Sequence, residues 1–297
     1  MVQSKNVIAL IAILAWSHGY GQDLRGVVDI HVHSDPDSVP RSIDAFGAVR
    51  LAAERGVRSV VLKNHYEPTA GLAWLARKQV PGIEVFGGIA LNLSVGGVNP
   101  AAVEQMTKVK GALGRVVWMP TFDAENQVRF SKESRPYAAV SRSGVLLPEV
   151  KAVLDLIARN NLVLATGHSA PAESLLLIRE AKARGIKHIV VTHPSIDPVG
   201  MSAQQMKQAV ALGAYLEFVT NAVIGNTATY KPAEYAAMIR EAGPESVILS
   251  SDLGQSGNPL HCDGLLEMYA ILRKHGFTVA EIERMAKINP SRLLGLE

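Results

Sequence analysis

Short apolar runs rich in Val and Ile alternate with longer amphipathic stretches along most of this chain. Short apolar runs are typical of buried strands, whereas apolar residues that recur every three or four positions are typical of helices. The pattern predicts strands over residues 27–33, 58–65, 83–91, 114–121, 162–168, 187–193, 213–219 and 245–252. It predicts helices over residues 42–55, 69–79, 100–112, 148–160, 172–184, 203–212, 232–242, 262–275 and 279–288.

This regular alternation predicts βαβ units and a parallel sheet. Several predicted helices begin at a Pro or a capping residue and end at Gly, as in "AAERG", "KARG" and "RKHG". Eight strand-then-helix units in about 250 residues fit a (β/α)8 TIM barrel with an additional C-terminal helix. An open doubly wound sheet is the alternative, but the Gly-rich phosphate fingerprint is absent after the first strand. No linker divides the chain, so we expect residues 22–297 to form a single barrel domain.

The N-terminal segment has the features of a secretory signal peptide. Lys5 precedes an apolar run over residues 7–16, and small and polar residues follow. The run is shorter than the roughly 20 apolar residues of a membrane-spanning helix. We therefore expect residues 1–21 to be a signal peptide and the mature protein to be periplasmic or secreted without a membrane span. An N-terminal core helix or a wrongly assigned start is the alternative, and the protein would then be cytoplasmic.

Composition and charge narrow the partners. Of the 297 residues, 48% are hydrophobic, and the net charge of +3 comes from scattered basic residues. Scattered charge of this size indicates neither a nucleic-acid tract nor a membrane-binding patch. A small-molecule substrate is the better expectation. Cys262 is the only cysteine, so it has no intramolecular disulfide partner.

Histidines and an aspartate stand at the carboxyl ends of four predicted strands. His31 and His33 close the first strand, His168 the fifth, His193 the sixth and Asp252 the eighth. Side chains two positions apart in a strand share a face, and in a closed barrel the carboxyl ends of the strands converge on one mouth. Neutral imidazoles with one carboxylate suit Zn2+ or a related divalent transition metal. The sequence therefore predicts a metal site at the barrel mouth.

The other histidines do not share this pattern. His188 begins a strand, His275 ends a helix and His18 falls in the predicted signal, so these three are interpreted as structural or surface residues. His261 lies near enough to Asp252 to stay undecided.

Two long connections fall on the predicted catalytic rim, over residues 122–144 and 220–231. Long connections in a compact domain are often functional or mobile. The first is either a lid over an anionic substrate or a solvated loop; its basic residues are Arg129, Lys132, Arg135 and Arg142.

The order of these ligand candidates resembles the amidohydrolase superfamily of metal-dependent hydrolases. The closing "NPSRLLGL" resembles the helix cap that often ends such proteins, and "VVLKNHYEPTA" and "FGGIALNLSVGGVNP" are most similar to an uncharacterised amidohydrolase-like group. The resemblance implies that His31, His33 and Asp252 hold a buried metal. It implies that His168 and His193 hold a second metal, with a bridging group between the two. Many relatives are dimers, so a homo-oligomer is one possibility.

The sequence departs from the superfamily at the bridge, because no Lys or Glu ends the fourth strand. Lys63, at the end of the second strand, is the nearest substitute. It could carry a carbamate bridge, act as a cation for the substrate or hydrogen-bond a ligand carboxylate. His65, in phase with Lys63, is either a catalytic proton donor or substrate contact, or a hydrogen-bonding support. Occupancy is therefore one or two ions. Glu217 and Asn92 are expected to turn away from the mouth, since one residue of register decides their direction.

The resemblance implies a hydrolase in which a metal-activated water attacks an amide, lactone or ester bond. Asp252 would take the proton and pass it to the leaving group, and His193 or His65 would stabilise the oxyanion. Three alternatives stay open. They are a mononuclear decarboxylase using His31, His33, His168 and Asp252, a phosphoesterase, and an exported metal-binding barrel without turnover.

Overall fold

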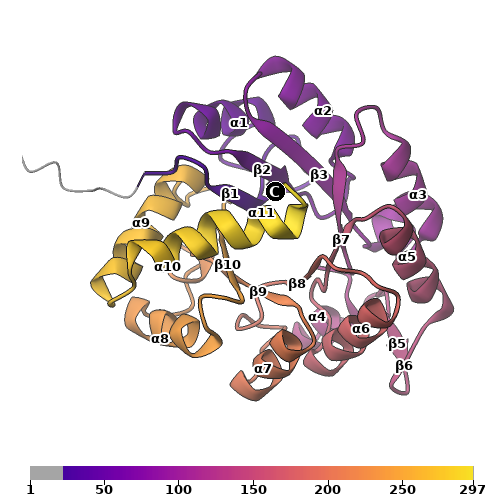
Figure 1. Cartoon of the computed structure of the whole chain (residues 1–297). Coiled ribbons are helices and arrows are strands. Elements are labelled where there is room, and N and C mark those ends of the chain that lie inside the picture. Colours follow the sequence, from indigo (N-terminus) through magenta and orange to yellow (C-terminus); the bar gives the residue numbers. More distant parts are fainter. Residues whose placement is uncertain (1–22, 297) are drawn as a thin grey trace, which may run out of the picture.

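The computed structural model describes residues 23–296, so the predicted signal peptide lies outside the described residues. Eight parallel strands form one sheet in the order β1-β2-β3-β4-β7-β8-β9-β10. Figure 1 shows them curled into a barrel inside a ring of helices. All eight predicted strands are confirmed, each shortened at one or both ends: β1 (Val28–Val32), β2 (Ser59–Leu62), β3 (Glu84–Ala90), β4 (Gly114–Trp118), β7 (Val163–Ala165), β8 (Ile189–Val191), β9 (Tyr215–Val219) and β10 (Val247–Ser250).

The barrel closes between its first and last strands through residues at their carboxyl ends. A parallel bridge joins Val32 to Leu253. The amide nitrogen of His33 donates to the Leu253 carbonyl at 2.9 Å, and that of Asp252 donates to the His31 carbonyl at 2.9 Å. The segment that carries Asp252 is thereby fixed against the strand that carries the two histidines. The (β/α)8 fold predicted from the sequence is confirmed.

Each barrel strand is followed by a helix that packs on the outside of the sheet (Figure 1). The strands are buried on both faces, as expected when helices cover a parallel sheet. Local signals explain the helix starts: Asp44 accepts a hydrogen bond from the Gly47 amide at 2.8 Å, and Asn99 caps the helix that begins at Pro100. The main helices are α1 (Ala45–Glu54), α2 (Ala70–Gln79), α3 (Pro100–Lys108), α5 (Pro148–Arg159), α6 (Pro171–Ala183), α7 (Ala203–Ala211), α8 (Pro232–Ala242) and α9 (His261–Lys274).

The C-terminal segment covers the amino ends of the strands. Helix α10 (Val279–Glu283) runs through a π-helical turn (Arg284–Ile288) into α11 (Asn289–Leu294), which extends the predicted C-terminal helix by several residues. Pro290 has no N–H to donate to the preceding turn, which accounts for the local rewinding. Asn289 donates to the carbonyls of Pro244 and Val247, where β10 begins. The opposite end of the barrel is therefore the end that stays open.

The connection over residues 122–144 is not the long loop that the sequence predicts. It contains the short helix α4 (Glu125–Phe130) and the strand β5 (Ser141–Arg142), which forms an antiparallel hairpin with β6 (Val145–Leu146) just beyond it. These elements are too short to show a periodic pattern. The connection over residues 220–231 begins with a short 3₁₀ helix (Thr220–Ala222), and another such turn (Leu93–Val95) follows β3.

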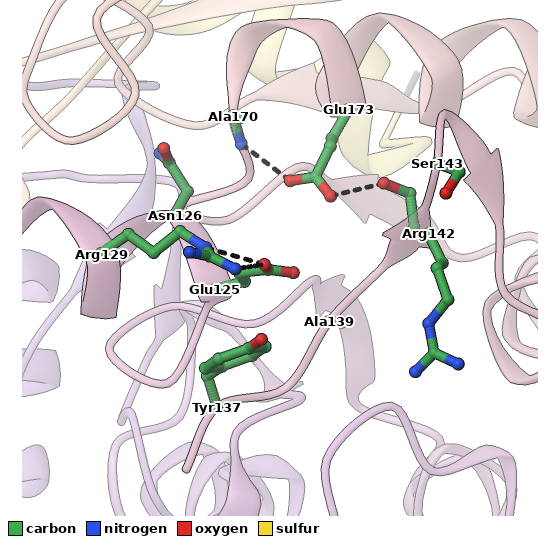
Figure 2. A pocket seen from close by; sticks show the side chains of 10 residues that line it. Glu125, Asn126, Arg129, Tyr137, Ala139, Arg142, Ser143, Ala170 and Glu173 are labelled. Atoms are coloured by element: carbon green, nitrogen blue, oxygen red, sulfur yellow. Dashed lines mark hydrogen bonds and ion pairs between the residues drawn. The ribbon is translucent and has the colours of Figure 1, made fainter. Parts of the chain in front are cut away.

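The basic residues of this first connection do not form a lid over the barrel mouth. Arg129 pairs with Glu125 at 2.6 Å, and Arg135 pairs with Asp123 and Glu133. Arg129 and Arg142 line a separate cavity between α4, the hairpin and α6 (Figure 2). None of the four basic residues lines the cavity at the open end of the barrel, so the structure gives the lid interpretation no support. No helix within residues 23–296 has the length and apolar character needed to cross a bilayer.

Candidate metal centre

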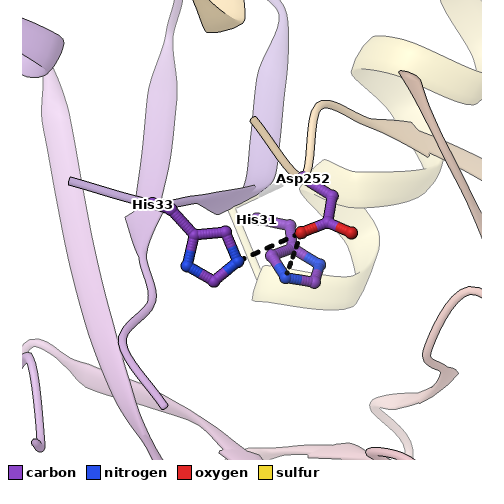
Figure 3. A group of neighbouring side chains, drawn as sticks. All are labelled: His31, His33 and Asp252. Atoms are coloured by element: carbon purple, nitrogen blue, oxygen red, sulfur yellow. Dashed lines mark hydrogen bonds and ion pairs between the residues drawn. The ribbon is translucent and has the colours of Figure 1, made fainter. Parts of the chain in front are cut away.

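His31, His33 and Asp252 meet at the open end of the barrel. One donor atom from each lies within 4.8 Å of the other two, and all three residues are buried. The Oδ1 atom of Asp252 is 3.1 Å from Nε2 of His31 and 3.0 Å from Nε2 of His33. Figure 3 shows both rings turned toward this carboxylate. The predicted grouping of these three side chains is thus present in the structure.

The backbone at the open end of the barrel adopts unusual φ angles and brings two segments very close together. Asp252 has φ +49° and His193 has φ +24°, a conformation that residues other than Gly seldom adopt. Such outliers cluster at functional sites, where surrounding contacts hold them in place. At Gly254 a Cβ atom would lie 2.1 Å from the carbonyl oxygen of His33. Only glycine lets the chain after β10 pass this close to the end of β1.

Five imidazoles form a closed circle at this end of the barrel. Neighbouring ring centroids lie 5.1 Å (His31–His33), 5.0 Å (His33–His65), 6.3 Å (His65–His168), 5.0 Å (His168–His193) and 6.3 Å (His193–His31) apart. His33, His65, His168 and His193 line a cavity of about 390 Å³ together with Lys63 and Asp252, whereas His31 does not line it. Residues separated by more than half of the chain are therefore brought together, as the barrel interpretation predicts.

The charge states of these groups suit a cation. Burial lowers the pKa of His33 to about 3 and that of His193 to about 4, so both rings are neutral at physiological pH. Burial alone would raise the pKa of Asp252, but His31 and His33 hold it well below its usual value. Neutral ring nitrogens and an ionised carboxylate oxygen are ligands of divalent transition metals.

Glu217 supports His31 from behind. Its Oε1 lies 3.0 Å from Nδ1 of His31 and accepts a hydrogen bond from Ser250 Oγ at 2.7 Å. Burial would raise the pKa of Glu217, but the contact with His31 keeps it below its usual value. The expectation that Glu217 turns away from the mouth is therefore wrong, because its position in β9 points inward. An acidic residue inside the apolar run "YLEFV" is the signal that could have revealed it.

Thr121 and Asn92 support His65. Thr121 Oγ1 lies 2.9 Å from Nδ1 of His65 and accepts a hydrogen bond from Asn92 Nδ2 at 2.7 Å. The ring of His65 also stacks on Phe122, with centroids 3.9 Å apart. Asn92 additionally accepts hydrogen bonds from the amides of Thr121 and Asp123, so its role is to hold loops together. Its expected absence from the cavity is consistent with this role.

His168 is oriented by Gln127, a residue that the sequence did not indicate. Gln127 Oε1 lies 2.8 Å from Nδ1 of His168, which leaves Nε2 of that ring available. The neighbouring Asn126 donates to the backbone carbonyl of His168 at 3.1 Å. Helix α4, within a connection predicted to be a loop, therefore positions one of the candidate ligands.

Lys63 reaches the donor atoms from the end of β2. Its Nζ atom is 2.9 Å from Nε2 of His31 and 5.4 Å from the centroid of the Trp118 ring. The side chain is buried, and burial lowers the pKa of Lys63 to about 8 although Asp252 and Glu217 oppose the shift. Lys63 therefore reaches the ring nitrogen that His31 would offer to a metal.

The remaining histidines of the described chain lie elsewhere. His261 is buried at the start of α9, does not line the cavity, and neither ring nitrogen has a hydrogen-bond partner within residues 23–296. His188 is half-buried next to the C-terminal segment, and His275 is exposed at the end of α9. The cavity instead gains a cation that sequence reasoning overlooked, Arg41.

Solved structures with the same architecture include several hydrolases. An organophosphorus hydrolase from Deinococcus radiodurans matches with a TM-score of 0.61 and 15% identity, over 91% of this chain and 92% of that one. A phosphotriesterase homology protein from Escherichia coli, complexed with phosphate in its active site, matches with a TM-score of 0.59 and 20% identity, over 91% and 99%. At these identities the likeness shows a common barrel fold.

A third structure is described as the engineering of organophosphate hydrolysis from a weak promiscuous lactonase template. It matches with a TM-score of 0.61 and 16% identity, over 91% of this chain and 96% of the other. A comparison with curated proteins finds no match. The model of a family described as "Family of unknown function (DUF6282)" matches residues 26–217, which is more than half of the chain.

Proposed function

We propose that this chain, which belongs to the family of unknown function DUF6282, is a metal-dependent hydrolase that cleaves an amide, lactone or ester bond of a small molecule. The observation that carries the proposal is the convergence of His31, His33 and Asp252, whose donor atoms lie within 4.8 Å of one another. They lie beside the His168 and His193 pair, around a cavity large enough for a small ligand. This is also the end of a barrel at which enzymes of this fold place their chemistry.

The donor set fits Zn2+ or a related divalent transition metal. Glu217 accepts a hydrogen bond at Nδ1 of His31, which leaves the lone pair at Nε2 to face Asp252. His31, His33 and Asp252 would hold one ion. His168 and His193 would hold a second, with Lys63 as the candidate bridging residue. When bound, such an ion supplies Lewis acidity that activates water and polarises a carbonyl or phosphoryl oxygen.

The chain's own residues would manage the protons. Asp252 is ionised and can accept a proton at its carboxylate oxygen and return it to the leaving group. Thr121 Oγ1 already accepts from Asn92, so its proton is free to be donated to Nδ1 of His65. The proton of the neutral His65 ring is then at Nε2, where it can stabilise an oxyanion in the cavity. Asp252 and His65 are therefore the proposed catalytic residues.

Phosphoester cleavage is the second candidate. The similar structures are described as organophosphorus hydrolases or carry phosphate in the active site, which favours phosphoryl chemistry in those proteins. In this chain the four basic residues over 129–142, which would suit an anionic substrate, do not line the cavity. Carboxylic esters and lactones are therefore the first substrates to test.

The test combines metal analysis with a substrate panel. We expect the purified protein to contain a divalent transition metal, to hydrolyse members of an ester, lactone and amide panel, and to lose activity when a chelator removes the metal. Adding Zn2+ should restore it. His33→Ala should abolish both metal binding and activity, whereas His275→Ala, at an exposed histidine, should affect neither.

Each rival has its own result. Phosphate release from aryl phosphates alone would favour the phosphoesterase. Carbon dioxide release without consumption of water would favour the decarboxylase. A fully metallated protein that is silent on the whole panel would favour a metal-binding barrel without turnover. Export, a single domain over residues 22–297 and a homo-oligomer also stay proposals; N-terminal sequencing of the mature protein tests the first and light scattering the last.

A further inference from the structure

A buried guanidinium lines the same cavity as the imidazoles. Arg41 lies on the connection between β1 and α1, and its side chain is only 4% exposed. Within the described chain, the cavity is lined by four side chains with a formal charge: Arg41, Lys63, Asp197 and Asp252. The proposed metal centre uses Lys63 and Asp252, so Arg41 is the lining cation left for a ligand.

Arg41 is held in a fixed position. Its Nε and Nη2 atoms lie 2.8 Å and 2.6 Å from Oδ2 of Asp37. Its backbone pairs with Gln255, and the next residue, Ser42, donates from its amide to the Gly254 carbonyl at 2.9 Å. These contacts tie Arg41 to the segment that directly follows Asp252. The guanidinium is therefore preorganised relative to the proposed metal centre.

Part of the guanidinium has no protein partner. Asp37 occupies the Nε and Nη2 side, whereas Nη1 is neither bonded to residues 23–296 nor sealed from solvent. A guanidinium stays charged and offers donors in a rigid fork that matches the oxygens of a carboxylate or a phosphate. A ligand oxyanion in the cavity that Arg41 lines would give this guanidinium a charge-assisted hydrogen bond in place of water.

The charged residues of the cavity would also orient an anionic ligand. Arg41 follows β1, while Asp197 follows β8, and β9 and β10 separate these two strands around the barrel. A negatively charged ligand group would be attracted to the β1 side and repelled from the Asp197 side. One anionic end, placed beside Arg41, would then leave the rest of the ligand over the imidazoles.

We propose that Arg41 is a specificity residue that selects substrates carrying an oxyanion, a carboxylate or a phosphate group, near the bond to be cleaved. This inference rests on the proposed hydrolase function for its kinetic consequence. The recognition of the oxyanion can be measured separately from turnover, so the two proposals can fail independently.

The kinetic test compares two esters that differ in charge but not in shape. They are the acetate esters of meta-hydroxybenzoic acid and of meta-hydroxybenzamide. We expect Arg41→Gln to lower kcat/KM for the acidic ester about 10- to 100-fold more than for the neutral one, the usual effect of losing a charge-assisted hydrogen bond. Arg41→Lys should fall between, because an ammonium keeps the charge but loses the fork.

Two further variants separate the recognition of the oxyanion from an effect on folding and from an effect of the protein's overall charge. Arg41→Gln with Asp37→Asn removes the ion pair together, so no carboxylate is left unpaired. Arg142→Gln removes one cation from the separate cavity beside α4 and should leave the preference between the two esters unchanged. An equal loss on both esters in the Arg41 variants would overturn the proposal.

Calorimetric titration of the metal-loaded protein tests the oxyanion site without turnover. The probes are benzoate, phenylphosphonate and neutral benzamide. We expect at least one of the two anions to bind more weakly to Arg41→Gln than to the wild type, and the anion that loses more affinity identifies the carboxylate or the phosphate class. If no ester is cleaved but this dependence on Arg41 holds, the hydrolase proposal fails and the oxyanion site stands. Equal anion affinity in wild type and variant overturns the site.

Discussion

The Nδ1 atom of His31 lies 3.0 Å from Oε1 of Glu217, a residue 186 positions away in the sequence. Both side chains are almost completely buried. A carboxylate at Nδ1 fixes the tautomer and the orientation of the ring, so that Nε2 presents its lone pair to a metal. Glu217 is thus a positioning residue for the proposed metal centre, without a direct place among the ligands.

This contact predicts a loss of metal affinity in Glu217→Gln. The amide keeps the size of the side chain but removes the negative charge that makes the His31 ring a stronger donor. We expect affinity for Zn2+ to fall about 10- to 100-fold, the usual effect of changing such a supporting group. Competition against a coloured chelator measures it. Ser250→Ala, which removes only the hydroxyl that donates to Glu217, should have a smaller effect. Equal affinities for Glu217→Gln and wild type would contradict the assigned role.

The position of Lys63 predicts how many ions are bound. Its Nζ atom lies 2.9 Å from Nε2 of His31, so Lys63 is the candidate for a group that would bridge two ions. We expect two metal ions per chain in the wild type and one in Lys63→Ala, measured by elemental analysis of the purified proteins. Lys63→Met fills more of the space and should also bind one ion, which separates the loss of the amine from the loss of packing. One ion in all three proteins would favour the mononuclear centre.

Much of the fold and of the ligand set could be predicted because both depend on short-range patterns. Strand periodicity places His31 and His33 on one face, and the alternation of strand and helix implies that all strand ends meet. The same logic brought His168, His193 and Asp252 to the mouth, where the structure places them around one cavity.

The positions of the supporting residues could not be predicted from periodicity, because long-range contacts decide them. Glu217 faces inward only in the register that β9 adopts against β10, and one residue of slip would reverse it. Gln127 depends on the short helix α4, and Arg41 depends on backbone pairing with Gln255. None of these contacts leaves a periodic pattern in the sequence.

The hydrogen bonds of Asn289 predict that its replacement destabilises the closed end of the barrel. Its Nδ2 atom donates to the carbonyls of Pro244 and Val247 at 2.9 Å and 2.7 Å, in a buried position. Asn289→Ala leaves both acceptors without this donor and should lower the free energy of unfolding by about 2 kcal/mol. Urea unfolding measures the change. Asn160→Ala, which loses one half-buried contact to Leu156, should cost about half as much or less. Equal stabilities of Asn289→Ala and wild type would contradict the stabilising role of these two hydrogen bonds.

The burial of His261 predicts that the free energy of unfolding decreases at acidic pH. Burial lowers the pKa of His261 from 6.5 to about 4, because the nearby Asp263 carboxylate opposes the shift only in part. Between pH 6.5 and pH 4, His261 binds a proton in the unfolded chain but stays neutral in the folded protein. The free energy of unfolding therefore falls as the pH falls. Between pH 7 and pH 5, His261 alone should remove about 2 kcal/mol of unfolding free energy.

The variant His261→Leu isolates this contribution, since it keeps an apolar side chain where neither ring nitrogen has a partner within residues 23–296. Buried histidines of the metal centre also disfavour protonation, but they are common to both proteins and cancel in the comparison. We expect the wild type to lose about 2 kcal/mol more than the variant between pH 7 and pH 5, measured by urea unfolding. His275→Leu, at an exposed position, should follow the wild type. Parallel curves for wild type and His261→Leu would mean that His261 accepts its proton as easily in the folded protein as in the unfolded chain.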